Sequence, residues 1–144
     1  GPFLELNQYS TSVELFILPM IISGSPFNLM VAKSVKDLAQ EQLEAYNKGD
    51  ITAFLRPYAP DVEAFDLAKG EQLFKGLDAM AKRYGPYFKA NPKLHCELVG
   101  RMVTDHYCID QEIVTGLASG ATVRAVAIYQ ANDGFIRRIW FLKG

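Results

Sequence analysis

The chain has 144 residues, a formal net charge of -1 and 49% hydrophobic residues. This length is typical of one domain that buries about 70% of its unfolded surface. Lysine and arginine form no cluster, which excludes the electrostatic footprint of a nucleic-acid-binding protein. The two cysteines, Cys96 and Cys108, fit neither a metal-ligand spacing nor a disulfide framework. We therefore expect a cytoplasmic protein with two buried thiols, without metal or organic cofactor, and with neither nucleic acid nor membrane as partner.

The N-terminal part contains a long stretch without charge, Leu15–Ala32, which raises the question of a membrane span. Pro19 and Pro26 interrupt it, so a spanning helix is not expected. We interpret residues 1–33 as an apolar arm, in part vector-derived, because Gly1-Pro2 resembles the remnant of a cleaved tag. So many apolar side chains should be covered, either at a sheet edge or on a partner subunit.

Regular signals begin at Ser34, whose spacing to Asp37 is that of a capping box. An amphipathic helix should follow and end at Gly49, since glycine accepts the left-handed C-terminal cap. Its buried stripe is Val35, Leu38, Ala39, Gln42 and Tyr46. Gln42 interrupts the stripe with an amide, which either bonds water at the helix flank or is a donor directed into a cavity.

A short second helix should run from Ile51 to Arg56, capped by Asp50 and stopped by Pro57 and Pro60. The next apolar run predicts a strand over Val62–Leu67.

A turn and a short return strand over Gln72–Phe74 come next. Gly76 then opens a third helix, which Pro86 should end or kink near Gly85. Its apolar stripe is Leu77, Met80, Tyr84 and Phe88.

The rest of the chain reads as strands separated by turns. The expected strands are Leu94–Val103, His106–Thr115, Ala121–Gln130 and Phe135–Leu142, with a tight hairpin at Asn132–Gly134. Long strands joined by short turns indicate an antiparallel meander. Helices first and strands afterwards predict an α+β domain over residues 34–144, with helices on one face of the sheet.

Three stretches together resemble the nuclear transport factor 2-like superfamily, in particular its SnoaL-like and ketosteroid isomerase-like members. They are AYNKGDITAFLRPYAPDVEAFDL, the helix FKGLDAMAKRY and the closing hairpin IYQANDGFIRRIWF. The resemblance covers about Ser34–Leu142 and is specific for fold. It implies a cone-shaped α+β fold, N-terminal helices packed on a curved, mainly antiparallel sheet, with an apolar pocket inside. It also implies a homodimer formed through the outer face of the sheet.

The functional residues of ketosteroid isomerases carry over only in part. Tyr58 and Asp61 match an element of that family, and Asp66 then falls on the position of the general base. Gln42 stands where that family has its oxyanion-hole tyrosine. The position of its protonated acid falls on Ala127, or on Val126 in a shifted register, and neither can donate a proton.

Two further patterns of the superfamily concern arginine and histidine. The epoxide hydrolase pattern needs an Asp–Arg–Asp triad, but the neighbours of Arg101 and Arg124 on their own strand faces are not acids. The dehydratase pattern relies on histidine, and His95 and His106 stand near strand ends. Both fit solvated or core positions, yet either could transfer a proton near neutral pH.

On its own terms, Asp66 shares a strand face with Val62 and Ala64. An apolar setting would disfavour the ionised carboxylate and so suit a general base near neutral pH. The alternative is that Asp66 caps the turn at Ala68–Gly70.

We therefore expect a pocket for a small apolar molecule bearing a carbonyl, with Asp66 as base and Gln42 or Tyr46 polarising an oxygen. The expected chemistry is proton transfer of the isomerase or cyclase type. The pocket lining should include Phe65, Tyr84, Phe88, Ala127, Tyr129 and Ile139. The competing interpretation is a non-catalytic ligand-binding or dimerisation module, which needs shape but no oxyanion donor.

Overall fold

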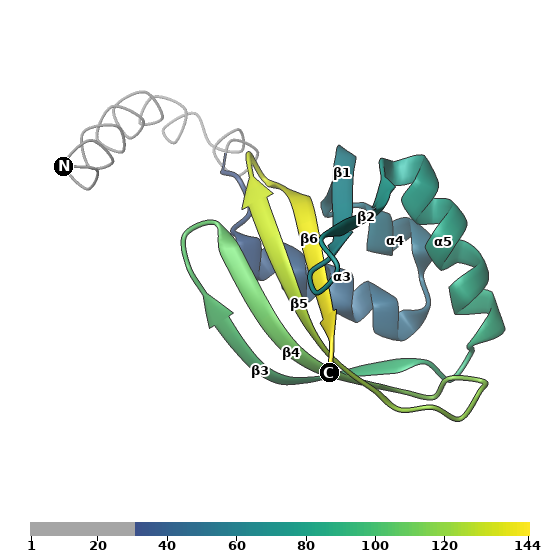
Figure 1. Cartoon of the computed structure of the whole chain (residues 1–144). Helices are drawn as coiled ribbons and strands as arrows, with labels where there is room; N and C mark the ends of the chain where they lie inside the picture. The colour runs from purple at the N-terminus through teal and green to yellow at the C-terminus, as the bar shows by residue number, and fades with distance from the viewer. Residues whose placement is uncertain (1–30) are drawn as a thin grey trace, which may run out of the picture. The chain divides into compact units, whose positions relative to one another are not determined.

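The computed structural model describes residues 31–144, in which Lys33–Gly144 form one compact unit. The interpretation of residues 1–33 as an arm thus falls, except for its last three residues, outside the described residues. The helices of the unit are α3 (Val35–Lys48), α4 (Ile51–Leu55) and α5 (Leu77–Ala90). Its strands are β1 (Tyr58–Asp66), β2 (Glu71–Lys75), β3 (His95–Val103), β4 (Tyr107–Thr115), β5 (Val123–Asn132) and β6 (Phe135–Lys143) (Figure 1). No helix within residues 31–144 is long and apolar enough to cross a membrane.

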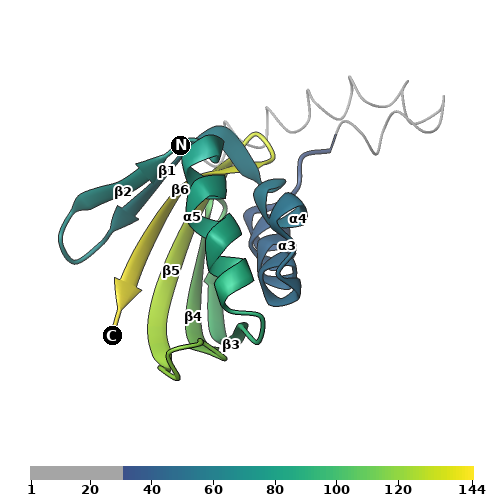
Figure 2. The ribbon, with the colours of Figure 1, turned by 90° about the vertical axis from the view of Figure 1, so that its right-hand side faces the viewer.

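The strands form one sheet in the order β2-β1-β6-β5-β4-β3. Neighbouring strands from β3 to β6 pair antiparallel, as do β1 and β2, and within residues 31–144 only β1 and β6 pair in parallel. The sheet curves strongly without closing, and the three helices lie on its concave side (Figure 1 and Figure 2). Helix α3 packs against β3, β4, β5 and β6, whereas α5 packs against β1 and β2. The predicted α+β class and the antiparallel run of the last four strands are confirmed.

The helix boundaries follow the capping residues in the sequence. Ser34 Oγ accepts a hydrogen bond from the Asp37 N–H at 3.1 Å, and Gly49 ends α3 in the left-handed conformation with φ 65°. Asp50 Oδ1 accepts from the Ala53 N–H at 3.1 Å and starts α4. Each cap satisfies a backbone group that a helix end otherwise leaves without a partner. These predictions are confirmed.

Two prolines behave differently from expectation. Strand β1 begins at Tyr58, so Pro60 lies inside it, at a point where the register to β6 shifts and a ladder donor is not required. The prediction that Pro86 ends or kinks the third helix near Gly85 is wrong about the end, because α5 continues to Ala90. The residues after Pro86 pack inward: Phe88 is buried and its ring lies 5.3 Å from that of Phe54. This aromatic packing offsets the hydrogen bond lost at the proline.

Two turns depend on backbone that favours glycine. The hairpin between β5 and β6 has positive φ at Asp133 (54°) and Gly134 (80°), which confirms the predicted turn. Gly116, after β4, has φ 73°, and a Cβ there would lie 1.8 Å from the Lys93 carbonyl oxygen. A side chain at this position would displace the loop before β3.

The outer face of the sheet also carries apolar side chains. Phe65 stacks on Trp140 with ring centroids 5.8 Å apart, and Val126 and Ile128 are half-buried on β5. A strand that is apolar on both faces is usually covered on both faces. The homodimer through this face stays a prediction, which light scattering on the full chain checks.

Candidate functional site

A cavity of about 670 Å³ lies between the helices and the inner face of the sheet. Its walls are mainly apolar and aromatic, with Leu43, Phe54, Val114, Leu117 and Phe141 among them. Such a space is within the usual size of small-molecule sites. The polar side chains on the walls therefore decide what chemistry the cavity could support.

Five of the nine site residues expected from the sequence line this cavity: Gln42, Tyr46, Asp66, Tyr84 and Tyr129. The other four, Phe65, Phe88, Ala127 and Ile139, are absent from the cavity wall. Phe65 is on the outer face against Trp140, and the remaining three are buried in the core.

Asp66 is half-buried at the end of β1, opposite Phe141 of β6. Its Oδ1 accepts a hydrogen bond from the Lys69 backbone N–H at 3.0 Å. The turn is closed further by the Gly70 N–H, which donates to the Asp66 carbonyl at 2.8 Å. Asp66 thus caps the turn after β1, which is the alternative role considered in the sequence analysis. It also lines the cavity.

Gln42 is 4% exposed and forms the centre of a buried hydrogen-bonded chain. The Tyr58 hydroxyl donates to Gln42 Oε1 at 3.1 Å, and Gln42 Nε2 donates to the Tyr129 hydroxyl at 3.0 Å and to the Ala39 carbonyl at 2.9 Å. Both amide hydrogens of Gln42 are therefore used within the protein.

The Tyr129 hydroxyl, at the end of this hydrogen-bonded chain, still has a donor hydrogen that the protein does not use within residues 31–144. Tyr129 accepts from Gln42, and its own hydroxyl hydrogen has no protein acceptor within residues 31–144. Burial raises the pKa of Tyr129 well above its usual value, so the phenol stays protonated at neutral pH. Tyr129 lines the cavity and is thus a neutral donor available to a ligand.

Tyr46 and the tyrosines of α5 form a second polar group. The hydroxyls of Tyr46 and Tyr87 are 2.8 Å apart and share a hydrogen bond. Burial raises the pKa of Tyr46 and takes the pKa of Tyr84 to about 12. All three line the cavity, and the raised pKa values keep Tyr46 and Tyr84 uncharged at neutral pH.

Besides Asp66, the cavity wall contains a second acid, Glu112 of β4. It is 8% exposed, and its Oε2 accepts a hydrogen bond from the Cys96 thiol at 3.2 Å. No ion pair within residues 31–144 involves it. Burial raises the pKa of Glu112 to about 7, against a partly compensating bond from Cys96. A carboxyl that ionises near neutral pH inside a cavity is suited to proton transfer.

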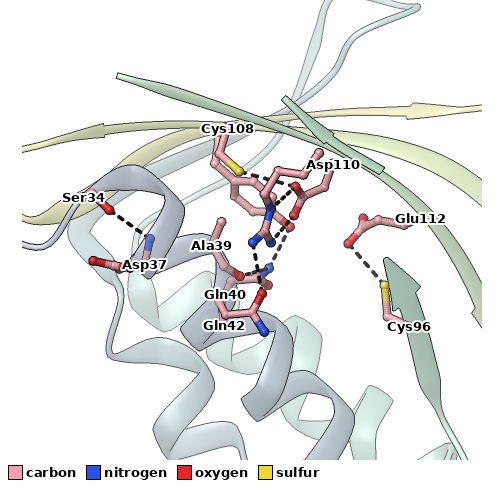
Figure 3. Close-up of polar contacts among 11 residues, drawn as sticks. Ser34, Asp37, Ala39, Gln40, Gln42, Cys96, Cys108, Asp110 and Glu112 are labelled. Atoms are coloured by element: carbon pink, nitrogen blue, oxygen red, sulfur yellow. Dashed lines mark hydrogen bonds and ion pairs between the residues drawn. The ribbon is translucent and has the colours of Figure 1, made fainter. Parts of the chain in front are cut away.

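Asp110 lies two residues earlier on the same face of β4 and has a different environment (Figure 3). Arg101 of β3 binds it with two hydrogen bonds, Nε to Oδ1 at 2.7 Å and the second guanidinium nitrogen to Oδ2 at 2.9 Å. Gln40 of α3 accepts from the same guanidinium at 3.0 Å, and the Cys108 thiol donates to Asp110 at 3.3 Å. Asp110 is fully buried and does not line the cavity, so this cluster joins α3 to the sheet.

Sequence reasoning missed both acids. The partners of Arg101 were sought on its own strand, whereas the partner is its neighbour across the ladder, Asp110. A usable signal was present: Cys108, Asp110 and Glu112 occupy every second position of one strand and therefore share a face, while Ile109, Gln111 and Ile113 share the other. The two histidines considered instead, His95 and His106, are exposed and do not line the cavity.

Comparison with solved structures identifies the fold. An uncharacterised cystatin-fold protein from Novosphingobium aromaticivorans is 20% identical and has a TM-score of 0.69, covering 76% of this chain and 98% of its own. AclR from Streptomyces galilaeus, provisionally named a hydroxylase, is 19% identical with a TM-score of 0.65, covering 76% and 87%. A protein from Kribbella flavida, provisionally named a ketosteroid isomerase, is 16% identical with a TM-score of 0.62, covering 75% and 76%.

A search of curated protein sequences gave no match. The SnoaL-like domain model matches residues 39–139, which span α3 to β6 and contain Gln42, Glu112 and Tyr129. This chain belongs to the SnoaL-like domain family.

Proposed function

We propose that this protein is an acid–base enzyme of the isomerase or cyclase type, acting on a small apolar molecule that bears a carbonyl group. The observation that carries the proposal is Glu112: a buried carboxyl without a cationic partner within residues 31–144, on the wall of a cavity of about 670 Å³. Ionised Glu112 would remove a proton from the carbon next to the carbonyl and return it at another position.

The negative charge that develops on the carbonyl oxygen requires a donor. Tyr129 supplies one, because its hydroxyl oxygen is held by Gln42 while its hydrogen has no protein acceptor within the described residues. Tyr58 in turn fixes the Gln42 amide. In this proposal Gln42 is a positioning residue, and Tyr129 takes the role that the sequence analysis gave to Gln42 or Tyr46.

Asp66 was the base expected from the sequence, and Glu112 is better supported in that role. Asp66 is half-buried with one oxygen bonded to the Lys69 backbone, whereas Glu112 is almost fully enclosed. Desolvation is what brings a carboxyl into the range of a general base at neutral pH, and it acts on Glu112.

Nitrobenzisoxazole tests for such a base without knowledge of the natural substrate. A carboxylate removes the ring C–H proton, the electron pair forms the nitrile, and the N–O bond breaks to give a coloured cyanonitrophenolate. We expect turnover to rise with pH through about 7, as Glu112 ionises. Glu112→Gln should lower the rate by about a hundredfold or more.

Two further variants complete this experiment. Glu97 is an exposed acid on the neighbouring strand β3, and Glu97→Gln should leave the rate unchanged. Tyr129→Phe should lower the rate by up to about a hundredfold without moving the pH dependence. A rate that survives Glu112→Gln would contradict Glu112 as the base.

A non-catalytic binding module is the second candidate function. It is favoured by the fact that every buried side-chain nitrogen and oxygen within the described residues already has a hydrogen-bond partner. For a binder, Glu112→Gln would leave the slow turnover of nitrobenzisoxazole unchanged, while a neutral apolar dye would still bind in the cavity.

A further inference from the structure

The cavity has two chemically different ends. The enclosed end carries Gln42, Tyr58 and Tyr129, which are 4%, 3% and 3% exposed. The lining residues that are exposed mark the other end, the mouth: Ala68, Lys69, Leu73, Arg83 and Lys143. A ligand that fills the cavity would therefore meet neutral hydroxyls inside and a different set of groups at the mouth.

Three of the five mouth residues are cations from three separate elements. Lys69 is in the turn between β1 and β2, Arg83 is on α5, and Lys143 ends β6. Within residues 31–144 none of their side chains forms an ion pair or a hydrogen bond with the protein. Only one carboxylate near the mouth, that of Asp66, lines the cavity with them. The described mouth residues thus carry three cations against one carboxylate, and no ion pair among them neutralises the cations.

Arg83 is in addition held in place by its surroundings. Its guanidinium carbon lies 5.6 Å from the centroid of the Phe74 ring, a cation–π contact. This contact uses none of the guanidinium N–H donors, which have no hydrogen-bond partner within residues 31–144 and are available for an anion. Leu73, the residue before Phe74, also lines the mouth, so the cation stands beside apolar surface.

We propose that the mouth binds the anionic group of an amphipathic ligand, such as a carboxylate, whose apolar body extends along the cavity toward Glu112. This inference rests on the proposed function and adds the substrate class to it: an organic acid with one anionic end and an apolar, carbonyl-bearing body. The arrangement also orients the ligand, because an anion would avoid the end that contains the Glu112 carboxyl.

Two dyes that differ by one charged group test the inference. Anilinonaphthalene sulfonate carries a sulfonate, and phenylnaphthylamine has the same ring skeleton without it. Titrations with the full chain, followed by dye fluorescence, should show tighter binding of the sulfonate dye at low salt. Raising the salt concentration should weaken only the sulfonate dye, because exposed charges are screened.

The decisive comparison uses two triple variants of equal net charge. The mouth variant is Lys69→Gln/Arg83→Gln/Lys143→Gln, and the control variant is Lys75→Gln/Lys82→Gln/Lys89→Gln, which changes three exposed cations outside the cavity wall. The mouth variant should raise the Kd of the sulfonate dye about tenfold, since each exposed charge contributes a few-fold. The control variant should leave that Kd unchanged, and phenylnaphthylamine should bind all three proteins equally. An equal loss in both variants, or none in the mouth variant, would overturn the inference.

The variant Ala125→Phe separates this result from a failure of the cavity itself. Ala125 lines the cavity, and a phenyl ring there should weaken both dyes. If phenylnaphthylamine responds to Ala125→Phe but the sulfonate dye ignores the mouth variant, the mouth has no anion site and the proposed function stands. If neither dye responds to Ala125→Phe, both bind elsewhere, and the cavity as a ligand site is contradicted together with the mouth.

Discussion

Asp110 and Glu112 are two carboxyls on one face of one strand, and they have opposite surroundings. Asp110 is bound by both arms of the Arg101 guanidinium and is sealed from the cavity. Glu112 has only a thiol as partner and faces the cavity. Both are buried, so burial alone does not separate a structural acid from a reactive one. The difference is the cation: a paired carboxylate is fixed in its charge, whereas an unpaired one is left able to exchange a proton.

The largest effect should come from removing the cation. Arg101→Met would leave the fully buried Asp110 without its ion-pair partner and should lower the free energy of unfolding by about 3–5 kcal/mol. Urea unfolding of the full chain measures this loss.

The double variant Arg101→Met/Asp110→Leu provides the control for that measurement. It removes both charges and should recover most of the lost stability, because an apolar pair of similar volume no longer buries an uncompensated charge. If the double variant is no more stable than Arg101→Met, the loss comes from packing and not from the isolated carboxylate.

The second largest effect concerns the pH dependence caused by Glu112. Its pKa rises from 4.5 to about 7 on folding, so the folded chain binds more protons than the unfolded chain between these values. Stability from this group is full below pH 4.5 and is lost as the pH rises through about 7. The loss amounts to about 3 kcal/mol by the linkage relation.

Glu112→Gln should remove this contribution. The unfolding free energy of the variant, measured in urea at pH 5 and pH 8, should fall less with pH than that of the parent. Glu97→Gln serves as the control, because an exposed acid on β3 should leave the slope unchanged. Identical slopes for the parent and Glu112→Gln would mean that Glu112 is ionised throughout this range.

The contrast between Asp110 and Glu112 also shows what could not be predicted from the sequence. The caps at Ser34 and Asp50, the turn at Gly134 and the antiparallel strands depend on local chemistry, and these were predicted. Whether an acid is paired depends on the register between strands, which places Arg101 opposite Asp110 and Leu98 opposite Glu112.

Two further misses have the same kind of cause. Helix α5 continues through Pro86 because distant aromatic rings pack on Phe88, and a local rule does not contain that contact. Tyr129 has its role through Gln42, and the two residues are separated by 87 positions in the chain.

A third prediction compares two tyrosine hydroxyls of the cavity wall, that of the buried Tyr58 and that of the half-buried Tyr46. Tyr58→Phe leaves Gln42 Oε1 without its donor in a fully enclosed place and should cost about 1–2 kcal/mol. Tyr46→Phe leaves the partly exposed Tyr87 hydroxyl, which can bond water instead, and should cost about 0.5 kcal/mol. Thermal unfolding of the two variants gives the order, and a reversed order would show that the Gln42 chain is not the more enclosed of the two.

A similarly small effect on stability is expected at Asp66, where a variant separates the two candidate bases. Asp66→Ala removes the acceptor for the Lys69 N–H at the edge of the cavity and should cost about 0.5–1 kcal/mol of stability. If Glu112 is the base, the turnover of nitrobenzisoxazole should stay within about twofold of the parent, since no proton passes through Asp66. A fall of a hundredfold would instead assign the base to Asp66, whatever its role in the turn.

Asp66→Ala should also affect binding of the sulfonate dye. It removes a negative charge that repels the sulfonate, so the dye should bind a few-fold more tightly, because Asp66 is the only carboxylate near the mouth among the described lining residues. Unchanged turnover with tighter dye binding would place Asp66 in ligand binding at the mouth, with Glu112 carrying the chemistry inside.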